Sequence, residues 1–380
     1  MEKQIQISRP SMGEEEWQAV KEPIMNGWLT QGPKVSEFEE QFAKEINALY
    51  AVALTSCTTA LHLSVLAAGV KRGDEVIVPA FSWVSTANAV EYCGATPVFV
   101  DVEQSSFNID PKKIAAAITP KTKAIIPVHL FGLPANMDAI KNEISENILI
   151  LEDAACAAGA LYKGKKVGNF SQSASFSFHP RKSITTGEGG MVTTNDKDIY
   201  EQLLVWRNHG LSASESMKIH GTQPYDMGDV NVLGYNYRMT DIQAAIGVVQ
   251  LKKMQKWINE RNYWANYYRQ HLSEIEWLSC PEVKEGLSHS WQAYVTYIHE
   301  EKAPQSRNKL MMYLKDNGIA TRPGTQAIHM LDFYKNKYNI NENDFPVAKA
   351  CFYQSMAIPM HNEMTQDDYD YVIKKINDFQ

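Results

Sequence analysis

Residues 51–102, AVALTSCTTALHLSVLAAGVKRGDEVIVPAFSWVSTANAVEYCGATPVFVDV, decide the fold class of this chain. Short apolar runs alternate here with helical stretches that close on a glycine. The runs are 51–54, 75–81 and 97–102, and the helical stretches are 58–69 and 86–94. Apolar runs of roughly four to eight residues between helices are typical of strands buried on both faces of a parallel sheet. The stretch therefore predicts repeated strand–helix units in an open, doubly wound α/β sheet.

The alternation continues downstream. Further strands are predicted at 124–130, 148–153, 173–179 and 190–194, with helices at 112–117 and 137–144. A long helix from Thr240 to about Leu272 leads into a region that mixes short strands with helices. About a hundred residues suffice for a small domain of this α+β kind. We expect a mostly parallel α/β sheet followed by a smaller α+β C-terminal domain.

The first fifty residues read as two helices joined by a loop. The helices are predicted at 12–25 and at 36–46, and Ser36 with Glu39 matches a capping box at the start of the second. The predicted division of the chain has three parts. Residues 1–50 hold these helices and an active-site loop, residues 51–250 a large cofactor-binding α/β domain, and residues 251–380 a hinge helix with the small domain.

Composition excludes several classes of protein. The 380 residues are 44% hydrophobic and 21% charged, with a net charge of −7, which disfavours a nucleic-acid surface. The five cysteines form no CxxC pair and no HExxH occurs, so neither a disulfide framework nor a metal site is expected. The start, MEKQIQISRP, lacks an apolar signal core, and no apolar stretch approaches the roughly 18 residues of a membrane span. A cytoplasmic protein without a membrane partner is predicted.

Polar residues that follow the predicted strands are candidates for chemistry, because ligands of such sheets bind at the carboxyl ends of the strands. Thr58 and Thr59 begin a helix, where free N–H groups suit a phosphate, although both also suit a simple helix cap. Asp153 closes a very apolar strand and needs either a cationic side chain or a protonated heteroaromatic nitrogen as its partner.

Lys182 lies between the strand SFSFH and the glycine-rich TTGEGG. Partial burial would lower its pKa and make its amine a nucleophile toward carbonyls, whereas an ordinary surface lysine is the alternative. Combined with the phosphate site, with Asp153 and with the aromatic Trp83, this lysine meets the needs of pyridoxal phosphate. The lysine forms a Schiff base, the acid keeps the pyridine nitrogen protonated, and the ring stacks on the aromatic side chain.

Six ordered blocks give the chain a resemblance to a known family. They are GWLTQGPKVSEFE (27–39), 55–90, VHLFGLPANMD (128–138), LEDAACAAGA (151–160), SFSFHPRKSITTGEGGMVTTND (175–196) and GYNYRMTDIQAAIGVVQL (234–251). Together they resemble the DegT-type sugar aminotransferases, a branch of the fold-type I pyridoxal phosphate enzymes, nearly from end to end.

The resemblance implies roles for individual residues. Lys182 would bind the cofactor and move the proton between the donor Cα and the cofactor, with Asp153 at the pyridine nitrogen and Trp83 against the ring. The implied phosphate ligands are Thr58, Thr59, Ser177 and, from across a subunit interface, Asn236. A homodimer with shared active sites is therefore expected. Residues implied to contact sugar or nucleotide are Trp28, Thr30 and His329.

Two positions depart from the family pattern. Cys156 stands where relatives often carry a Gln or Glu that contacts the cofactor hydroxyl, and a thiol is a weaker donor. Cys57 stands where many relatives have glycine, which is tolerable if its φ stays negative.

The implied activity is transfer of an amino group from an amino acid, by analogy glutamate, to a nucleotide-linked keto-deoxysugar for surface polysaccharide. Alternatives are a transaminase or lyase acting on a non-nucleotide keto-sugar or carbocycle, and a cofactor-binding sensor without turnover. A related lineage that dehydrates sugars at C3 carries histidine in place of the lysine, so Lys182 argues against that chemistry. The segment 159–165 mimics a phosphate-binding loop, but Lys166 follows it instead of Ser or Thr, and a hairpin is predicted.

Overall fold

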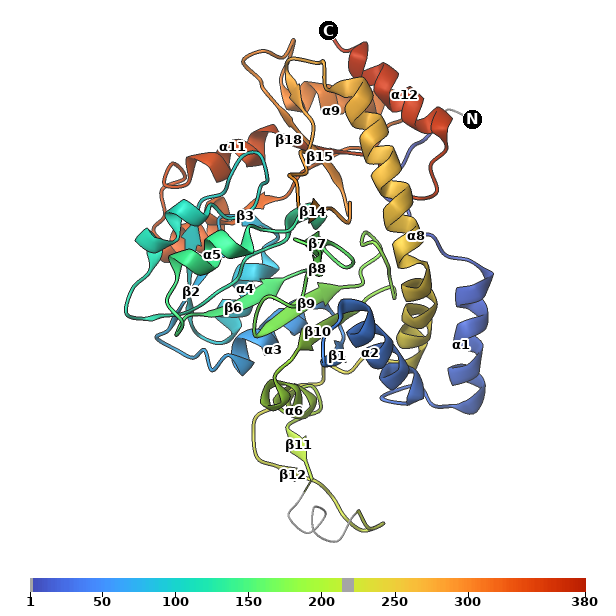
Figure 1. The fold of residues 1–380 in the computed structure, drawn as a ribbon, viewed down its shortest axis with the longest axis vertical. Coiled ribbons are helices and arrows are strands. Elements are labelled where there is room, and N and C mark those ends of the chain that lie inside the picture. The colour runs from blue at the N-terminus through green and yellow to red at the C-terminus, as the bar shows by residue number, and fades with distance from the viewer. Residues whose placement is uncertain (1–2, 214–221) are drawn as a thin grey trace.

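The computed structural model describes residues 3–213 and 222–380 and is built around a seven-stranded sheet (Figure 1). The strand order is β1-β10-β9-β6-β5-β2-β4. The strands are β1 (Tyr50–Leu54), β2 (Glu75–Pro79), β4 (Thr96–Val100), β5 (Thr122–Ile125), β6 (Leu149–Asp153), β9 (Ser173–Ser177) and β10 (Gly190–Thr194). Only β10 runs against its neighbours β1 and β9, and the other pairings are parallel. The expected mostly parallel sheet is confirmed.

Helices cover both faces of this sheet. In β2, Val78 packs into a core that includes Leu61 of α3 (Cys57–Ala67) and Val90 of α4 (Ser85–Tyr92). The preceding residue of the strand, Ile77, packs into a separate core with Ile140 of α5 (Met137–Glu143). Successive side chains of a strand point to opposite faces, so one apolar strand supplies both cores. Each fully buried side chain of this size contributes about 1.5–3 kcal/mol.

The long helix α8 (Asp241–Leu272) connects the two parts of the chain (Figure 1). Its first half packs against α1 (Glu14–Asn26) and α2 (Pro33–Ile46), and its last turns place Tyr268 and Leu272 in the core of the C-terminal region. Thr240 caps it in a capping box with Gln243. Because one helix serves both cores, we propose α8 as the hinge, and the expected boundary at residue 250 falls inside it.

The C-terminal region is built on a four-stranded sheet of order β13-β15-β18-β16. Its elements are β13 (Leu278–Ser279), β15 (Tyr294–Ile298), α9 (Arg307–Asp316), β16 (Arg322–Pro323), α10 (Asp332–Tyr338), α11 (Pro346–Gln354), β18 (Ser355–Ile358) and α12 (Gln366–Asn377). Ile5 lies in the same core and bridges Ile319, so the N-terminal segment is shared between both parts.

Short elements complete the fold. β3 (Phe81–Ser82) pairs with β17 (Gln326–Ala327), and β7 (Leu161–Tyr162) pairs with β8 (Lys165–Lys166) and β14 (Leu287–Ser288). The β7–β8 pair confirms the hairpin predicted for residues 159–165. Beyond α6 (Lys197–Trp206), an arm carries β11 (Leu211–Ser212) and β12 (Asp229–Val230) away from the sheet (Figure 1).

Two local predictions are wrong. The second helix begins at Pro33, not after Ser36, because Asp241 accepts hydrogen bonds from the N–H groups of Gly32 (2.7 Å) and Lys34 (3.0 Å) and so caps it from a distant element. Residues 112–117 form two 3-10 turns, Pro111–Lys113 and Ala115–Ala117, instead of one α-helix.

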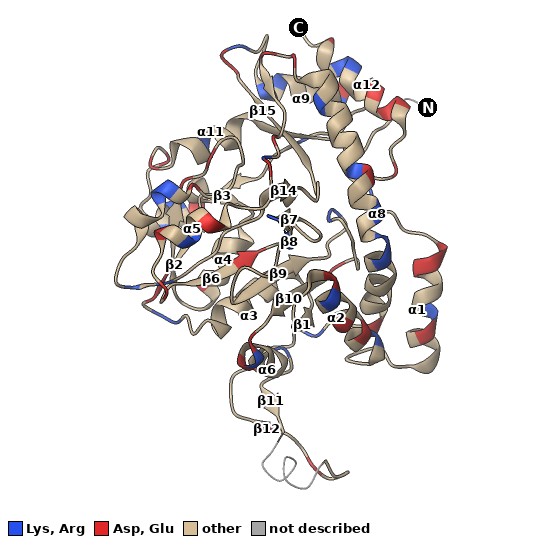
Figure 2. Cartoon of the chain, in the orientation of Figure 1, with Lys and Arg blue, Asp and Glu red and all other residues tan. Residues whose placement is uncertain are grey.

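Charged residues of both signs are interspersed over the ribbon (Figure 2). The acidic first turn of α1 faces α8, where Lys253 pairs with Glu15 (2.6 Å) and Glu16 (2.8 Å). Within residues 3–213 and 222–380, no helix combines the length and apolar character that crossing a membrane requires.

Candidate active site

A cavity of about 380 Å³ opens at the carboxyl ends of the central strands. The sheet side of its wall includes Asp153 after β6, Ser177 at the end of β9 and Thr58 at the start of α3. The C-terminal region closes it with Gln292, Gly324 and Thr325. A cavity of this volume is in the range of small-molecule sites, and it lies where the strand ends were expected to converge.

Asp153 is buried at the end of β6, with 4% of its surface exposed. Thr86 donates a hydrogen bond to Oδ2 (2.8 Å) and the N–H of Ala155 donates one to Oδ1 (3.1 Å). Burial raises the pKa of this carboxyl, and these two donors only partly oppose that effect. A buried carboxylate whose donors do not compensate its desolvation is suited to bind a further cationic group in the cavity.

Lys182 projects into the same cavity, with its Nζ 3.2 Å from the Sγ of Cys156. Burial alone would lower its pKa, but Cys156, Cys57 and Asp153 outweigh that effect and raise it. The predicted lowered pKa is therefore wrong for the side chains as they stand here. The sulfur of Cys156, at the position where the resemblance implies Gln or Glu, contacts the lysine.

The start of α3 forms the side of the cavity where the sequence predicts a phosphate site. The Oγ of Ser56 accepts a hydrogen bond from the N–H of Thr59 (3.2 Å), and Thr59 Oγ1 donates to the Ser56 carbonyl (2.7 Å). Ser56 is thus the N-cap, and the Thr59 hydroxyl completes the capping box by accepting from the Ser56 N–H (3.2 Å). Thr58 instead lines the cavity and donates to Ser85 (3.0 Å). Gly190 of β10 permits the close approach of this turn, because a Cβ there would lie 2.3 Å from the Ser56 carbonyl carbon.

Two further predicted residues lie in the cavity wall. Trp83 is 61% exposed and lies beside the β3–β17 pairing, so its ring is free to cover a flat ligand. Cys57 is the first residue of α3 and keeps a negative φ, which confirms that cysteine is tolerated there. Burial raises the pKa of its thiol well above the ordinary value.

Five predicted residues, among them Thr59, do not line the cavity of this chain. Trp28 and Thr30 are exposed in the loop before α2, where Thr30 bridges Thr240. Asn236 is exposed and its backbone bridges that of Asn208. His329 is fully buried, with its Nε2 3.3 Å from the Glu342 carbonyl, so the structure does not bring its ring to the substrate cavity.

Several cavity residues were missed by sequence reasoning. Ser85 lines the cavity at the start of α4, and the next residue, Thr86, donates to Asp153 from just outside it. Their position soon after a strand was the available signal. Arg181 and Glu188 flank the lysine in the block SFSFHPRKSITTGEGG. Gln292, Gly324 and Thr325 come from the C-terminal region, where no local pattern marked them.

The arrangement fits pyridoxal phosphate on its own terms. The under-compensated carboxylate of Asp153 suits a protonated ring nitrogen, and Lys182 supplies an amine in the same cavity. The hydroxyls of Thr58 and Ser177, together with the start of α3, suit a phosphate. These three requirements are met in one cavity of suitable volume.

Comparison with known proteins agrees with this site. Residues 10–377 match the DegT/DnrJ/EryC1/StrS aminotransferase family. The Bacillus subtilis spore coat polysaccharide biosynthesis protein SpsC is 38% identical over 98% of this chain and 96% of its own. A Streptococcus pneumoniae protein provisionally assigned as a sugar aminotransferase, Spr1654 in its PMP form, superposes with a TM-score of 0.91 at 30% identity, covering 98% of both chains.

A third relative is GDP-4-keto-6-deoxymannose-3-dehydratase, ColD, solved as a variant with bound GDP-perosamine. Its TM-score is 0.89 at 29% identity, covering 98% of this chain and 100% of that chain. The family match over nearly the whole chain agrees with the fold and with the pyridoxal phosphate site described above. The chain belongs to the DegT/DnrJ/EryC1/StrS aminotransferase family and is a pyridoxal-phosphate-dependent aminotransferase.

Proposed function

We propose that this enzyme moves the amino group of glutamate to a nucleotide-linked keto-deoxysugar, and that the product serves a surface polysaccharide. The observation that carries the proposal is one cavity that is lined by Lys182, Asp153 and Arg181. The guanidinium of Arg181 suits anionic groups such as a carboxylate or a diphosphate. Two relatives support the acceptor class: SpsC is a spore coat polysaccharide biosynthesis protein, and ColD was solved with bound GDP-perosamine.

Each cavity residue takes a defined role in this proposal. When bound, the cofactor supplies a ring that withdraws electrons from the carbon atom losing or gaining a proton. Lys182 would hold the cofactor through its aldehyde and would move the proton at the donor Cα. Asp153 holds the ring nitrogen protonated, and Trp83 covers the ring.

The phosphate and hydroxyl contacts are less direct. Thr58 and Ser177 line the cavity and are proposed phosphate ligands. Thr59 contributes through its cap, which orders the first turn of α3, although a ligand role for its hydroxyl was expected. Cys156 stands where the resemblance implies Gln or Glu, and it contacts Lys182, so its thiol is proposed to face the cofactor from the lysine side.

A homodimer with shared sites is part of the proposal. Exposed apolar side chains gather on the arm and on the loop before α2, which lie outside the cavity of their own chain. They are Trp28, Leu29, Leu211, Val230, Val232 and Leu233. Exposed apolar surface of this extent is typical of an interface. A second copy would bring Asn236 and the Trp28–Thr30 loop to the neighbouring cavity.

All five cysteines are free, which suits the proposed cytoplasmic location.

The acceptor is tested with the enzyme converted to its amino form by glutamate. That form is mixed with a panel of nucleotide-linked keto-sugars and with matched keto-sugars that lack the nucleotide, and the return of the cofactor aldehyde absorbance is followed. We expect return only with nucleotide-linked acceptors. Return with the free sugars or with a carbocyclic ketone would move the assignment to the alternative substrates. No change of the spectrum on adding glutamate or other amino acids would contradict turnover itself.

A further inference from the structure

The carboxylate of Glu152 lies on the face of β6 opposite to the cavity, because Glu152 and Asp153 are consecutive in one strand. It is fully buried and accepts four hydrogen bonds. The donors are His129 Nε2 (3.0 Å), the N–H groups of Gly168 (3.0 Å) and Phe170 (2.9 Å), and the hydroxyl of Ser171 (2.6 Å). No part of the proposed chemistry uses this buried carboxylate.

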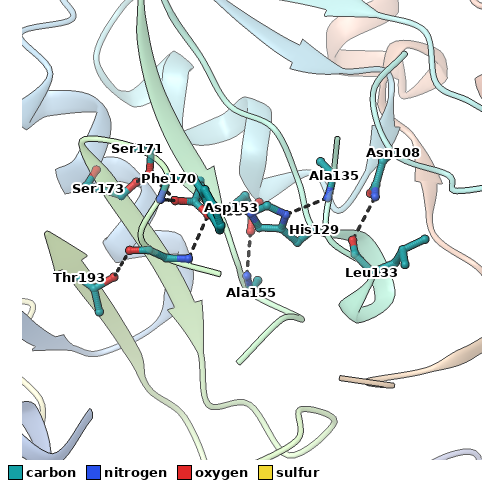
Figure 3. A network of polar contacts seen from close by, with 12 residues as sticks. Asn108, His129, Leu133, Ala135, Asp153, Ala155, Phe170, Ser171, Ser173 and Thr193 are labelled. Atoms are coloured by element: carbon teal, nitrogen blue, oxygen red, sulfur yellow. Dashed lines mark hydrogen bonds and ion pairs between the residues drawn. The ribbon is translucent and has the colours of Figure 1, made fainter. Parts of the chain in front are cut away.

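His129 fixes the orientation of this network (Figure 3). The N–H of Ala135 donates to its Nδ1 (3.0 Å), so the ring proton lies on Nε2 and points to Glu152. Both ring nitrogens are used and the side chain is fully buried. The imidazole therefore joins β6 to the segment 128–135 in one defined rotamer and tautomer.

The backbone of His129 meets Asp153 itself. The N–H of His129 donates to the Asp153 carbonyl (3.0 Å), and the N–H of Asp153 donates to the Pro127 carbonyl (2.9 Å). The segment that follows supplies Val128, Leu130 and Phe131 to the cavity wall. The side chain of His129 thus anchors, from behind the sheet, the backbone that borders the cofactor-facing carboxylate.

The same segment meets the C-terminal region. The carbonyl of Phe131 accepts from the N–H of Gln292 (3.0 Å), and the carbonyl of Gly132 accepts from the N–H of Ser290 (3.0 Å). Phe131 adopts a left-handed φ of 58°, which a bulky side chain keeps only where its surroundings enforce it. The segment that His129 anchors behind β6 is therefore hydrogen-bonded to the part of the C-terminal region that closes the cavity.

We propose that Glu152 and His129 are positioning residues, which hold Asp153 and the Val128–Phe131 wall in the geometry that binds the cofactor. This inference rests on the proposed role of Asp153. A Glu152–His129 contact that served stability alone would leave cofactor binding by the folded protein unchanged. A positioning contact alters cofactor affinity and the rate constant while the protein stays folded.

Two histidine variants separate the two contacts of the ring. His129→Asn keeps an acceptor near Nδ1 for the Ala135 N–H and loses the donor to Glu152. His129→Gln places an amide donor near Nε2. Ser171→Ala is the matched control, because it removes a donor to Glu152 on the side away from His129. The cofactor-stripped full-length variants are titrated with pyridoxal phosphate at a temperature where circular dichroism shows each one folded.

We expect His129→Asn and Glu152→Gln to raise the Kd for pyridoxal phosphate at least tenfold and to lower kcat with little change in the donor KM. His129→Gln should recover part of that loss, and Ser171→Ala should bind as the unaltered protein does. Wild-type Kd in folded His129→Asn and Glu152→Gln would overturn the inference, and so would an equal loss in Ser171→Ala. If Asp153→Asn also binds and reacts normally, the proposed role of Asp153 fails instead.

Discussion

Two carboxylates stand side by side in β6, and their surroundings differ. Glu152, behind the sheet, accepts four hydrogen bonds, and these outweigh burial and lower its pKa. Asp153, facing the cavity, accepts two, and burial raises its pKa. Both groups are buried in the same strand. The number of hydrogen-bond donors, and not the extent of burial, therefore distinguishes the two carboxylates. Asp153, which has fewer donors, is the one proposed to bind a cationic group of the cofactor.

The largest expected effect comes from the residue that shares the cavity with Asp153. Lys182→Ala removes both the covalent link to the cofactor and the group that moves the proton. We expect transamination to fall by about 10⁴-fold or more, with the cofactor still bound noncovalently. The measurement is the rate of spectral change on adding glutamate, compared with the unaltered enzyme. Retained transamination would show that the amine in this cavity is not the reacting one.

Asp153→Asn removes the charge of the carboxylate that faces the cavity. The amide keeps the shape but no longer stabilises a positive ring nitrogen, so we expect kcat to drop by roughly 10²–10³-fold. Circular dichroism should show an unchanged fold. A near-normal rate would mean that the raised pKa of Asp153 reflects burial without function.

Stability should respond to the two carboxylates with opposite sign. The lowered pKa of Glu152 adds stability that is present above its unfolded pKa of about 4.3 and is lost as pH falls through the folded pKa. Glu152→Gln should therefore cost about 1–3 kcal/mol at neutral pH. The raised pKa of Asp153 costs stability above its folded pKa, so Asp153→Asn should stabilise the cofactor-free protein there.

Urea unfolding of the cofactor-free variants between pH 4 and pH 8 checks both signs. The two variants should diverge at neutral pH and converge toward acid. If Asp153→Asn lowers the free energy of unfolding as much as Glu152→Gln does, the contrast between the two faces of β6 is wrong.

The smallest effect is expected at Cys156. Its sulfur makes one contact with Lys182, and a single hydrogen bond contributes about 0.5–1.5 kcal/mol. Cys156→Gln, which introduces one of the two residues that the family resemblance implies here, should change the cofactor Kd and kcat by less than about tenfold. A titration with pyridoxal phosphate and steady-state rates measure this. Complete loss of cofactor binding would show that the thiol is essential to this particular site.

Much of this arrangement was readable from the sequence, and the reason is local. Asp153, Lys182, Thr58 and Trp83 each follow a strand whose apolar run was plain, and parallel strands bring their carboxyl ends together. The β–α order that fixes the sheet is likewise a local pattern. The family resemblance added the roles.

The remaining features depend on contacts between distant residues. Ser36 was predicted to cap the second helix from its local sequence. The helix begins at Pro33 instead, because Asp241, a distant residue, caps it there. The family resemblance implied a substrate contact for His329. Its burial depends on packing against Phe345, which no local pattern in the sequence indicated. The Glu152–His129 contact joins a residue of β6 to the segment that follows β5, and no local pattern in the sequence indicated this pairing.

The most direct test of the account reduces the cofactor-loaded enzyme with borohydride and maps its peptides by mass spectrometry. The account predicts one pyridoxyl group, carried by the peptide that contains Lys182. A pyridoxyl group on another lysine, or none on any peptide, would contradict the assignment of the cavity beside Asp153.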